Sequence, residues 1–217
     1  VRRGWLVEFK GRRSGCRAYL AVAGGIAVPP LMNSRATYLR GGFGGFGGRA
    51  LQTGDLLPIT PVDWHLPARA GRRFPPHLLP PYSDQPTVEV ILGPQAEAFP
   101  SAGLRTFLGN EYEISAETDR MGYRLHGPAI VHRGAADIVS DGIVLGAVQV
   151  PADRQPIVMM ADRQTTGGYP KIAVVASADI PLLAQCLPGR SRVRFRETTV
   201  GEAQARYRQR MLNLPEQ

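Results

Sequence analysis

Short runs of apolar residues, separated by polar turns, recur along most of the chain. Residues 87–92 alternate polar and apolar side chains, which is the two-residue period of a half-buried strand. Residues 5–10 and 16–23 flank a turn rich in Gly and Ser, and we expect them to form a hairpin. Comparable runs predict further strands at 112–115, 122–125, 146–150, 157–161, 172–176 and 192–197. Short strands at this spacing are typical of a β-barrel or a β-sandwich.

Helical patterns are few and lie between or after the strands. Residues 101–108 are one candidate, ended by Gly-Asn. A second helix is expected over 180–186, with Asp179 as its N-cap. A Thr-x-x-Glu capping box opens a third helix over 199–212. We therefore expect a mainly β fold with a few short peripheral helices.

Two segments lack any regular period. Residues 41–48 contain six glycines, which is too many for a helix or a long strand. Residues 58–86 are rich in proline and predict a loop and linker centred near Pro80. This pattern divides the chain into residues 1–80, the remainder of a first β subdomain, and residues 86–217, a second subdomain that forms the barrel.

The charge balance is basic but dispersed. The chain carries 26 basic and 18 acidic residues, a formal net charge of +8, and Lys10 and Lys171 are its only lysines. Arginines at positions 190, 192, 194 and 196 share one face of a predicted strand, but such a face is more often solvated. Because polyanion binding requires clustered basic side chains, we expect no nucleic-acid partner.

The cysteines and the apolar runs restrict the cellular setting. Cys16 and Cys186 lie far apart in sequence and neither belongs to a C-x-x-C pair, which favours a reducing compartment such as the cytoplasm. The apolar runs have the length of strands, whereas a membrane span needs about 20 residues. We expect a cytoplasmic protein without a membrane partner.

Several familiar site motifs are not supported by their context. Gly42, Gly44 and Gly47 satisfy G-x-G-x-x-G, but no helix pattern follows them, and no P-loop is present. The histidines at 65, 77, 126 and 132 lack metal-ligand spacing, so no metal is expected. Neither cysteine has the surroundings of a nucleophile, and there is no G-x-S-x-G.

Two polar segments that adjoin predicted strands are the better site candidates. Residues 118–125 place Asp119 beside Arg120 at a strand entrance, although a turn with a local ion pair explains them equally well. Residues 162–170 (DRQTTGGYP) directly follow an apolar strand. Their Gln164 can pair with a small amide through both a donor and an acceptor, although a plain polar turn is the alternative.

These two strings, together with residues 146–151, closely resemble the carboxyltransferase A/B family. The resemblance also takes in 17–25, 34–38 and 48–55, and it runs from about Arg17 to Ala203. The family includes the C subunit of 5-oxoprolinase, proteins formerly called allophanate hydrolase subunit 2, the KipA regulators, and a domain of urea carboxylase. It implies a cyclophilin-like β-barrel. Because family members carry a further stretch upstream, we expect the first subdomain to be incomplete.

For activity, the resemblance implies chemistry on a small amide. The favoured interpretation is the C subunit of an ATP-dependent 5-oxoprolinase, an amide-cleaving hydrolase that is inactive without its A subunit and its KipI-like B subunit. ATP would bind this chain or a partner. One alternative is a carboxyltransferase acting on urea with biotin from another chain, since neither lysine has a biotin-accepting context. The other is a KipA-like, non-enzymatic regulator that binds an inhibitor of a sensor kinase.

The strings nominate specific residues for the site. The predicted catalytic residues are Asp162, Gln164, Asp119 and Arg120. The predicted substrate-binding residues are Gln149, Thr165, Thr166, Gly167, Gly168, Tyr169 and Tyr123. We further expect Asp162 and Arg120 to lie together at the mouth of the barrel, and the Gln164 amide to face a cleft.

Overall fold

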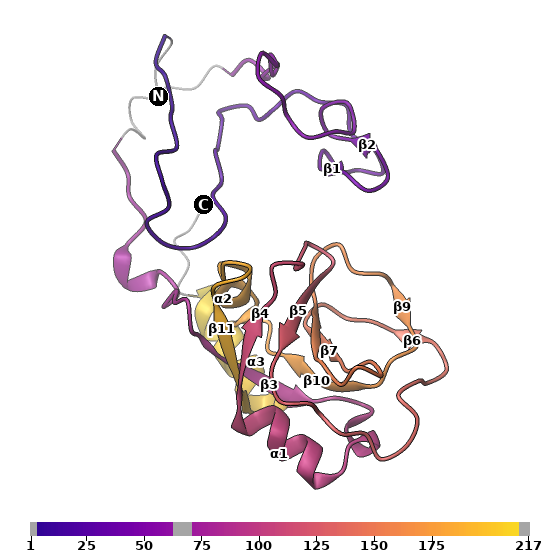
Figure 1. The fold of residues 1–217 in the computed structure, drawn as a ribbon. Helices are drawn as coiled ribbons and strands as arrows, with labels where there is room; N and C mark the ends of the chain where they lie inside the picture. The colour runs from indigo at the N-terminus through magenta and orange to yellow at the C-terminus, as the bar shows by residue number, and fades with distance from the viewer. Residues whose placement is uncertain (1–3, 63–70, 213–217) are drawn as a thin grey trace. The chain divides into compact units, whose positions relative to one another are not determined.

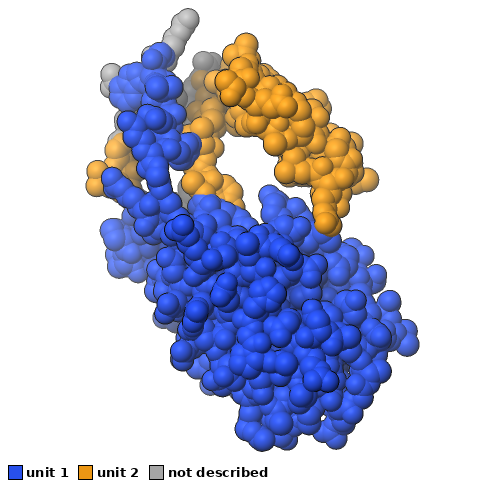
Figure 2. Space-filling model, in the orientation of Figure 1, with its two compact units in different colours: residues 1–17, 74–217 blue, residues 18–73 orange. Residues whose placement is uncertain are grey.

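The computed structural model of the chain describes residues 4–62 and 71–212. It separates into two compact units, one formed by residues 1–17 and 74–217 and the other by residues 18–73 (Figure 2). The division into 1–80 and 86–217 that the proline-rich linker suggests stays a prediction. The barrel, the helices and every predicted site residue belong to the first unit.

A closed seven-stranded barrel forms the body of the first unit (Figure 1). Around the barrel the strand order is β10-β3-β11-β4-β5-β8-β7, and β7 pairs with β10 to close it. The β3–β11 pair is parallel and the other barrel pairs are antiparallel. The strands are β3 (Thr87–Leu92), β4 (Glu111–Ile114), β5 (Gly122–His126), β7 (Ala147–Gln149), β8 (Ile157–Met159), β10 (Lys171–Val175) and β11 (Arg192–Glu197). The expected mainly β barrel is confirmed.

The alternation of side chains in the strands produces the barrel core. In β11, Val193 and Phe195 are buried, whereas the arginines between and beside them are exposed. Phe195 stacks on Phe107 with ring centroids 4.5 Å apart, and Tyr112 lies against both rings. These aromatic contacts fix the helix that carries Phe107 against the barrel.

In the part of the chain that the structure describes, three α-helices and two 3-10 turns accompany the barrel (Figure 1). The helices are α1 (Ser101–Gly109), α2 (Ile180–Ala184) and α3 (Val200–Leu212), and the 3-10 turns are η2 (Pro76–Leu78) and η3 (Ala96–Ala98). The capping box is present at α3. The Thr199 hydroxyl accepts a hydrogen bond from the Glu202 N–H at 3.3 Å, and the Glu202 carboxylate accepts one from the Thr199 N–H at 3.0 Å.

Asp179 corrects one detail of the sequence analysis. It occupies the N-cap position of α2, but its side chain makes no capping hydrogen bond. Its carboxylate instead accepts a hydrogen bond from the Glu89 N–H at 2.7 Å and forms an ion pair with Arg206. The carboxylate therefore ties α2, β3 and α3 together rather than closing the end of a helix.

The hairpin expected over residues 5–23 does not form. No strand is present at 5–10 or 16–23, and the Leu6 and Phe9 side chains are 89% and 73% exposed. An apolar strand face needs a surface to pack against, and these side chains have none.

In the described part of the second unit, residues 18–62 and 71–73, turns surround one short ribbon. The strands β1 (Thr37–Tyr38) and β2 (Phe43–Gly44) pair within it, and the glycine-rich stretch supplies the turns. A Cβ on Gly45 would lie 1.9 Å from the Thr37 hydroxyl, so the ribbon requires glycine there. Both carboxylate oxygens of Asp55 accept hydrogen bonds from Arg49, which fixes the following turn and lowers the pKa of Asp55 to about 2.

No helix within the described residues is long and apolar enough to cross a membrane.

Candidate functional site

A second short ribbon covers part of the outer wall of the barrel. It pairs β6 (Asp141–Gly142) with β9 (Thr166–Gly167), and in Figure 1 it lies on the side of the barrel opposite α3. Ile143, Ala147 and Met159 pack together as a small cluster separate from the barrel core. Because strand side chains alternate, Gln149 of β7 points to the same outer face as Ala147.

Backbone hydrogen bonds fix the loop that contains the DRQTTGGYP string. The Thr165 carbonyl accepts a hydrogen bond from the Ile143 N–H at 2.9 Å, and the Gly168 carbonyl accepts one from the Ile138 N–H at 2.7 Å. A Cβ on Gly167 would lie 2.6 Å from the end of the Ile143 side chain and 3.0 Å from Gln149 Nε2. Glycine at 167 therefore lets the loop approach the wall of the barrel closely.

An open groove of about 540 Å³ runs along this loop. Exposed Gln164 lines it, as the sequence predicts. The Gln164 amide nitrogen also lies 3.6 Å from the position that a Cβ on Gly167 would occupy, so the two glutamine amides converge on Gly167. The remaining lining residues are Gly142, Ile143, Val144, Ala161, Arg163 and Thr165.

Asp162 and Arg120 lie together, as predicted. Arg120 donates two hydrogen bonds to the Asp162 carboxylate, from Nε at 2.8 Å and from Nη2 at 3.0 Å. Their backbones are also joined, because the Asp162 N–H donates to the Arg120 carbonyl at 2.9 Å. This two-point geometry holds both side chains in one orientation beside Ala161 of the groove.

Asp119 does not pair with its neighbour Arg120. One of its carboxylate oxygens accepts hydrogen bonds from the Met121 N–H at 2.8 Å and the Gly122 N–H at 3.2 Å. This local pattern is an Asx turn that begins β5. The structure therefore gives Asp119 a role in the turn, and its catalytic role stays a prediction.

The two predicted tyrosines occupy different surroundings. Tyr123 is wholly buried in the barrel core, and its hydroxyl accepts a hydrogen bond from Arg17. Burial raises the pKa of that hydroxyl. The structure does not bring Tyr123 to the groove. Tyr169 is 40% exposed, and its carbonyl accepts a hydrogen bond from Gln149 Nε2 at 3.3 Å, which joins the end of the loop to β7.

A polar cluster that was not predicted from the sequence lies beneath the ribbon. The Lys171 side chain is only 3% exposed, and its Nζ donates to Asp141 at 2.7 Å. Gln95 joins both residues, since its Oε1 accepts from the Lys171 N–H at 3.3 Å and its Nε2 donates to Asp141 at 3.4 Å. The lysine and the Gly142 N–H lower the pKa of Asp141. Lys171 is one of only two lysines in an arginine-rich chain, and this was the available signal.

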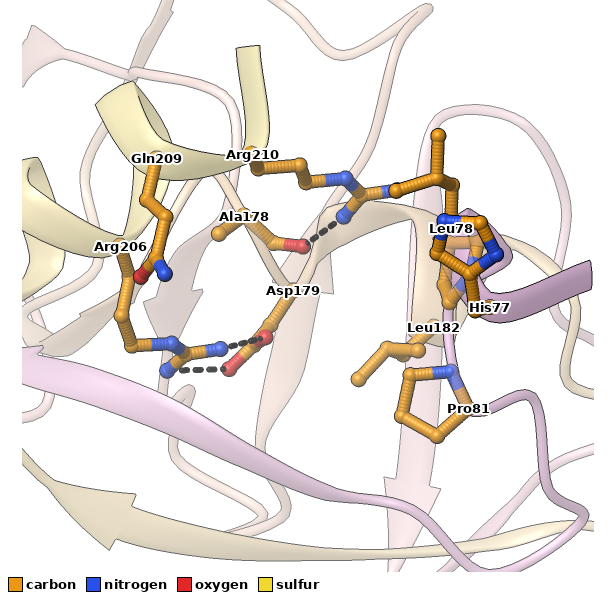
Figure 3. A pocket seen from close by; sticks show the side chains of 10 residues that line it. His77, Leu78, Pro81, Ala178, Asp179, Leu182, Arg206, Gln209 and Arg210 are labelled. Atoms are coloured by element: carbon orange, nitrogen blue, oxygen red, sulfur yellow. Dashed lines mark hydrogen bonds and ion pairs between the residues drawn. The ribbon is translucent and has the colours of Figure 1, made fainter. Parts of the chain in front are cut away.

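A second cavity lies between η2, α2 and α3 (Figure 3). It measures about 300 Å³, and its apolar wall includes Leu78, Pro81 and Leu182. On its polar side, Arg206 pairs with Asp179 and Arg210 donates to the Ala178 carbonyl. Arginine therefore neutralises the buried carboxylate of this cavity.

No cluster of three potential metal ligands occurs within residues 4–62 and 71–212. His65 lies outside the described residues.

A family model described as carboxyltransferase domain, subdomain A and B, matches residues 1–197. The chain belongs to this carboxyltransferase domain family. The resemblance seen in the sequence is therefore confirmed, and it covers both units of the structure.

Relatives of this family match most of the chain. It is 38% identical to the 5-oxoprolinase C subunit of Escherichia coli and 36% identical to that of Haemophilus influenzae, in each case over 94% of this chain and 63% of the relative. The chain thus spans less than two thirds of the length of these relatives. Among solved structures, K. lactis urea amidolyase is similar with a TM-score of 0.80 and 26% identity, over 92% of this chain and 13% of that one.

Proposed function

We propose that this chain is the C subunit of an ATP-dependent 5-oxoprolinase, which opens the lactam of 5-oxo-L-proline to L-glutamate with A and B subunits. The observation that carries the proposal is the 38% identity, over 94% of the chain, to a protein of that name. In this proposal the chain acts in the cytoplasm and is inactive alone.

The groove beside β9 is the proposed substrate site. A small amide fits its chemistry, because the exposed Gln164 that lines it offers both a donor and an acceptor. The Arg120–Asp162 pair at the adjoining edge supplies a fixed guanidinium and a fixed carboxylate. These can stabilise charge that develops on the amide and hold a proton near it.

ATP does not fit the glycine-rich stretch of this chain. Residues 41–48 form β2 and the turns on either side of it, and within the described residues 49–62 no helix N-terminus follows them to hold a phosphate. We therefore propose that ATP binds a partner subunit.

The test replaces Gln164 by leucine in the assembled complex. Removing one member of an amide pair leaves the other polar group unpaired, which costs about 1–3 kcal/mol. We expect Gln164→Leu to reduce ATP-dependent opening of 5-oxo-L-proline by about 10- to 100-fold, with an almost unchanged melting temperature. Full activity of the variant would remove Gln164 from the site, and a wild-type complex without turnover would contradict the proposed function.

Similarity to urea amidolyase supports a second candidate, a biotin-dependent carboxyltransferase acting on urea. In that case another chain supplies the biotin. Carboxylation of urea by the complex after addition of a biotinylated partner would favour this candidate over lactam opening.

A further inference from the structure

Arg163 is the only charged residue among the described residues that line the groove beside β9. Next to it along the loop, Gln164 and Thr165 contribute an amide and a hydroxyl to the same lining. The apolar part of the lining consists of Ile143, Val144 and Ala161. The groove therefore combines one cation, two neutral polar groups and an apolar wall, which is the usual composition of a small-molecule site.

Backbone carbonyls hold the guanidinium of Arg163 in place. Its Nε donates a hydrogen bond to the Ile143 carbonyl at 3.1 Å, and its Nη1 donates one to the Met160 carbonyl at 3.3 Å. Both acceptors are neutral, so these bonds orient the guanidinium without neutralising its charge. A side chain that is already oriented loses little conformational freedom when a ligand binds to it.

The third nitrogen of this guanidinium remains available to a ligand. Arg163 Nη2 makes no hydrogen bond to a described residue. Among the described residues, no buried side-chain nitrogen or oxygen lacks a partner, so Nη2 of this half-buried residue is in contact with solvent. An accessible N–H donor on an oriented guanidinium is well suited to bind a carboxylate.

The acidic residues near the groove are paired with other cations. Asp162, which precedes Arg163 in the chain, accepts two hydrogen bonds from Arg120. Asp141, which precedes Gly142 of the groove, pairs with Lys171 at 2.7 Å. No ion pair joins Arg163 to an acidic residue in the described part of the chain. The charge of Arg163 is therefore left for an anionic ligand.

We propose that Arg163 binds the carboxylate of the substrate, so that the groove selects an amide that carries a carboxylate over an uncharged amide. This inference rests on the proposed function and refines it. In 5-oxo-L-proline the carboxylate would pair with Arg163, the lactam with Gln164, and the ring methylenes would lie against the apolar wall. Urea has neither a carboxylate nor an apolar part, so the same groove disfavours urea.

The test compares two lactams that differ only in the carboxylate, 5-oxo-L-proline and 2-pyrrolidone. Competition calorimetry on the assembled complex, with a non-hydrolysable ATP analogue present, measures both affinities. We expect the wild type to bind 5-oxo-L-proline about 10-fold more tightly, which is the effect of one charge-assisted hydrogen bond. Arg163→Met should bind both lactams equally and keep the wild-type affinity for 2-pyrrolidone. A purely structural role of Arg163 would instead weaken both lactams by the same factor.

Arg105→Met is the matched control. Arg105 is an exposed arginine of α1 whose side chain makes no hydrogen bond to a described residue, and it does not line the groove. This variant should keep the full preference for 5-oxo-L-proline. Equal binding of the two lactams by the wild type, or a preference that survives in Arg163→Met, would overturn the assignment.

Two further variants keep the test decisive if Arg163→Met fails to fold. Arg163→Lys and Arg163→Gln can both still donate to a backbone carbonyl, but only the lysine retains the charge. We expect the lysine variant to prefer 5-oxo-L-proline over 2-pyrrolidone and the glutamine variant to bind them equally. The same preference in both variants would contradict a role of the charge.

Failure of the Arg163 assignment differs from failure of the proposed function. If the wild-type complex opens 5-oxo-L-proline but does not prefer it to 2-pyrrolidone, the assignment is wrong and the proposed function stands. A wild-type complex without turnover contradicts the proposed function. The assignment is then decided by N-acetylglycine and its uncharged counterpart N-methylacetamide. The wild type must prefer the former and Arg163→Met must not, and absence of binding overturns the assignment.

Discussion

Arg206 of α3 offers a sharp test of how buried charge holds this fold together. Its guanidinium pairs with Asp179, which is 2% exposed (Figure 3), and also with Glu89, which is 9% exposed. Glu89 keeps a second partner in Arg196, at 2.7 Å. Among the described residues, Arg206→Met would therefore leave Asp179 with the Glu89 N–H as its direct hydrogen-bond donor, and only the more distant charges of Arg196 and Arg210 would still act on it.

The expected loss of stability in Arg206→Met follows from the burial of Asp179 and the partial exposure of Arg206. Removing one partner of a buried ion pair costs about 3–5 kcal/mol. Because the Arg206 side chain is 39% exposed, part of that interaction is screened by water, and we expect a loss of about 2–3 kcal/mol at pH 8. Urea unfolding followed by circular dichroism measures this difference.

The loss of stability in Arg206→Met should be larger at pH 8 than at pH 5. Burial raises the pKa of Asp179 to about 6, against the opposing effect of Arg196 and Arg210. An acid with a raised pKa stabilises the fold when protonated, and this contribution disappears as the pH rises through 6. At pH 5 Asp179 is mostly neutral in the wild type and more so in the variant, so the loss should shrink to about 1 kcal/mol or less.

Arg208→Met is the matched control. It makes the same substitution on the same helix, at a residue whose side chain donates a 3.4 Å hydrogen bond to the Gln204 carbonyl. We expect no more than about 0.5 kcal/mol of destabilisation there. If both variants lose equal stability, or if the loss in Arg206→Met is the same at pH 5 and pH 8, the buried-charge explanation is wrong.

Three further predictions concern the cap, the loop and the ribbon. Thr199→Ala removes the hydroxyl that accepts the Glu202 N–H and should destabilise the protein by about 1 kcal/mol in urea unfolding. Gly167→Ala places a Cβ 2.6 Å from an isoleucine methyl and should weaken substrate binding in calorimetry, whereas Gly168→Ala, with its nearest neighbour at 3.3 Å, should bind normally. The Lys171 partner lowers the pKa of Asp141. The ion pair therefore stabilises the fold fully above the ordinary pKa of 3.8, and this stabilisation is lost as the pH falls through the lowered pKa. Asp141→Asn should therefore flatten the acid limb of the stability curve.

The sequence was informative wherever local rules decide the structure. Alternation of polar and apolar residues placed β11 and the first half of β3 correctly, and the capping box located the start of α3. The Asp162–Arg120 contact was also predicted, because both polar strings adjoin a strand end, and the pairing of β5 with β8 in the structure brings the two residues together.

The remaining features depend on contacts between distant segments. The apolar residues near Leu6 have a strand-like pattern but no sheet to join. Lys171 begins an apolar strand, and nothing local reveals that the ribbon carrying Asp141 covers it. Asp179 has the sequence position of a cap, but Arg206, 27 residues later, takes its carboxylate. In each case the contacts of the tertiary structure, rather than the local sequence pattern, decide the outcome.

The parallel pairing of β3 with β11 determines when the barrel can form during synthesis. Residues 87–90 hydrogen-bond to residues 194–197, so the ring stays open until more than a hundred intervening residues have been made. Until then, the edges of β3 and β4 that pair with β11 in the complete barrel have no partner. These edges can then pair with other strands. Such distant pairing slows folding, because the entropy of closing a long loop is lost before the contacts form. A nascent chain that stops before Arg192 lacks the strand that completes the barrel wall.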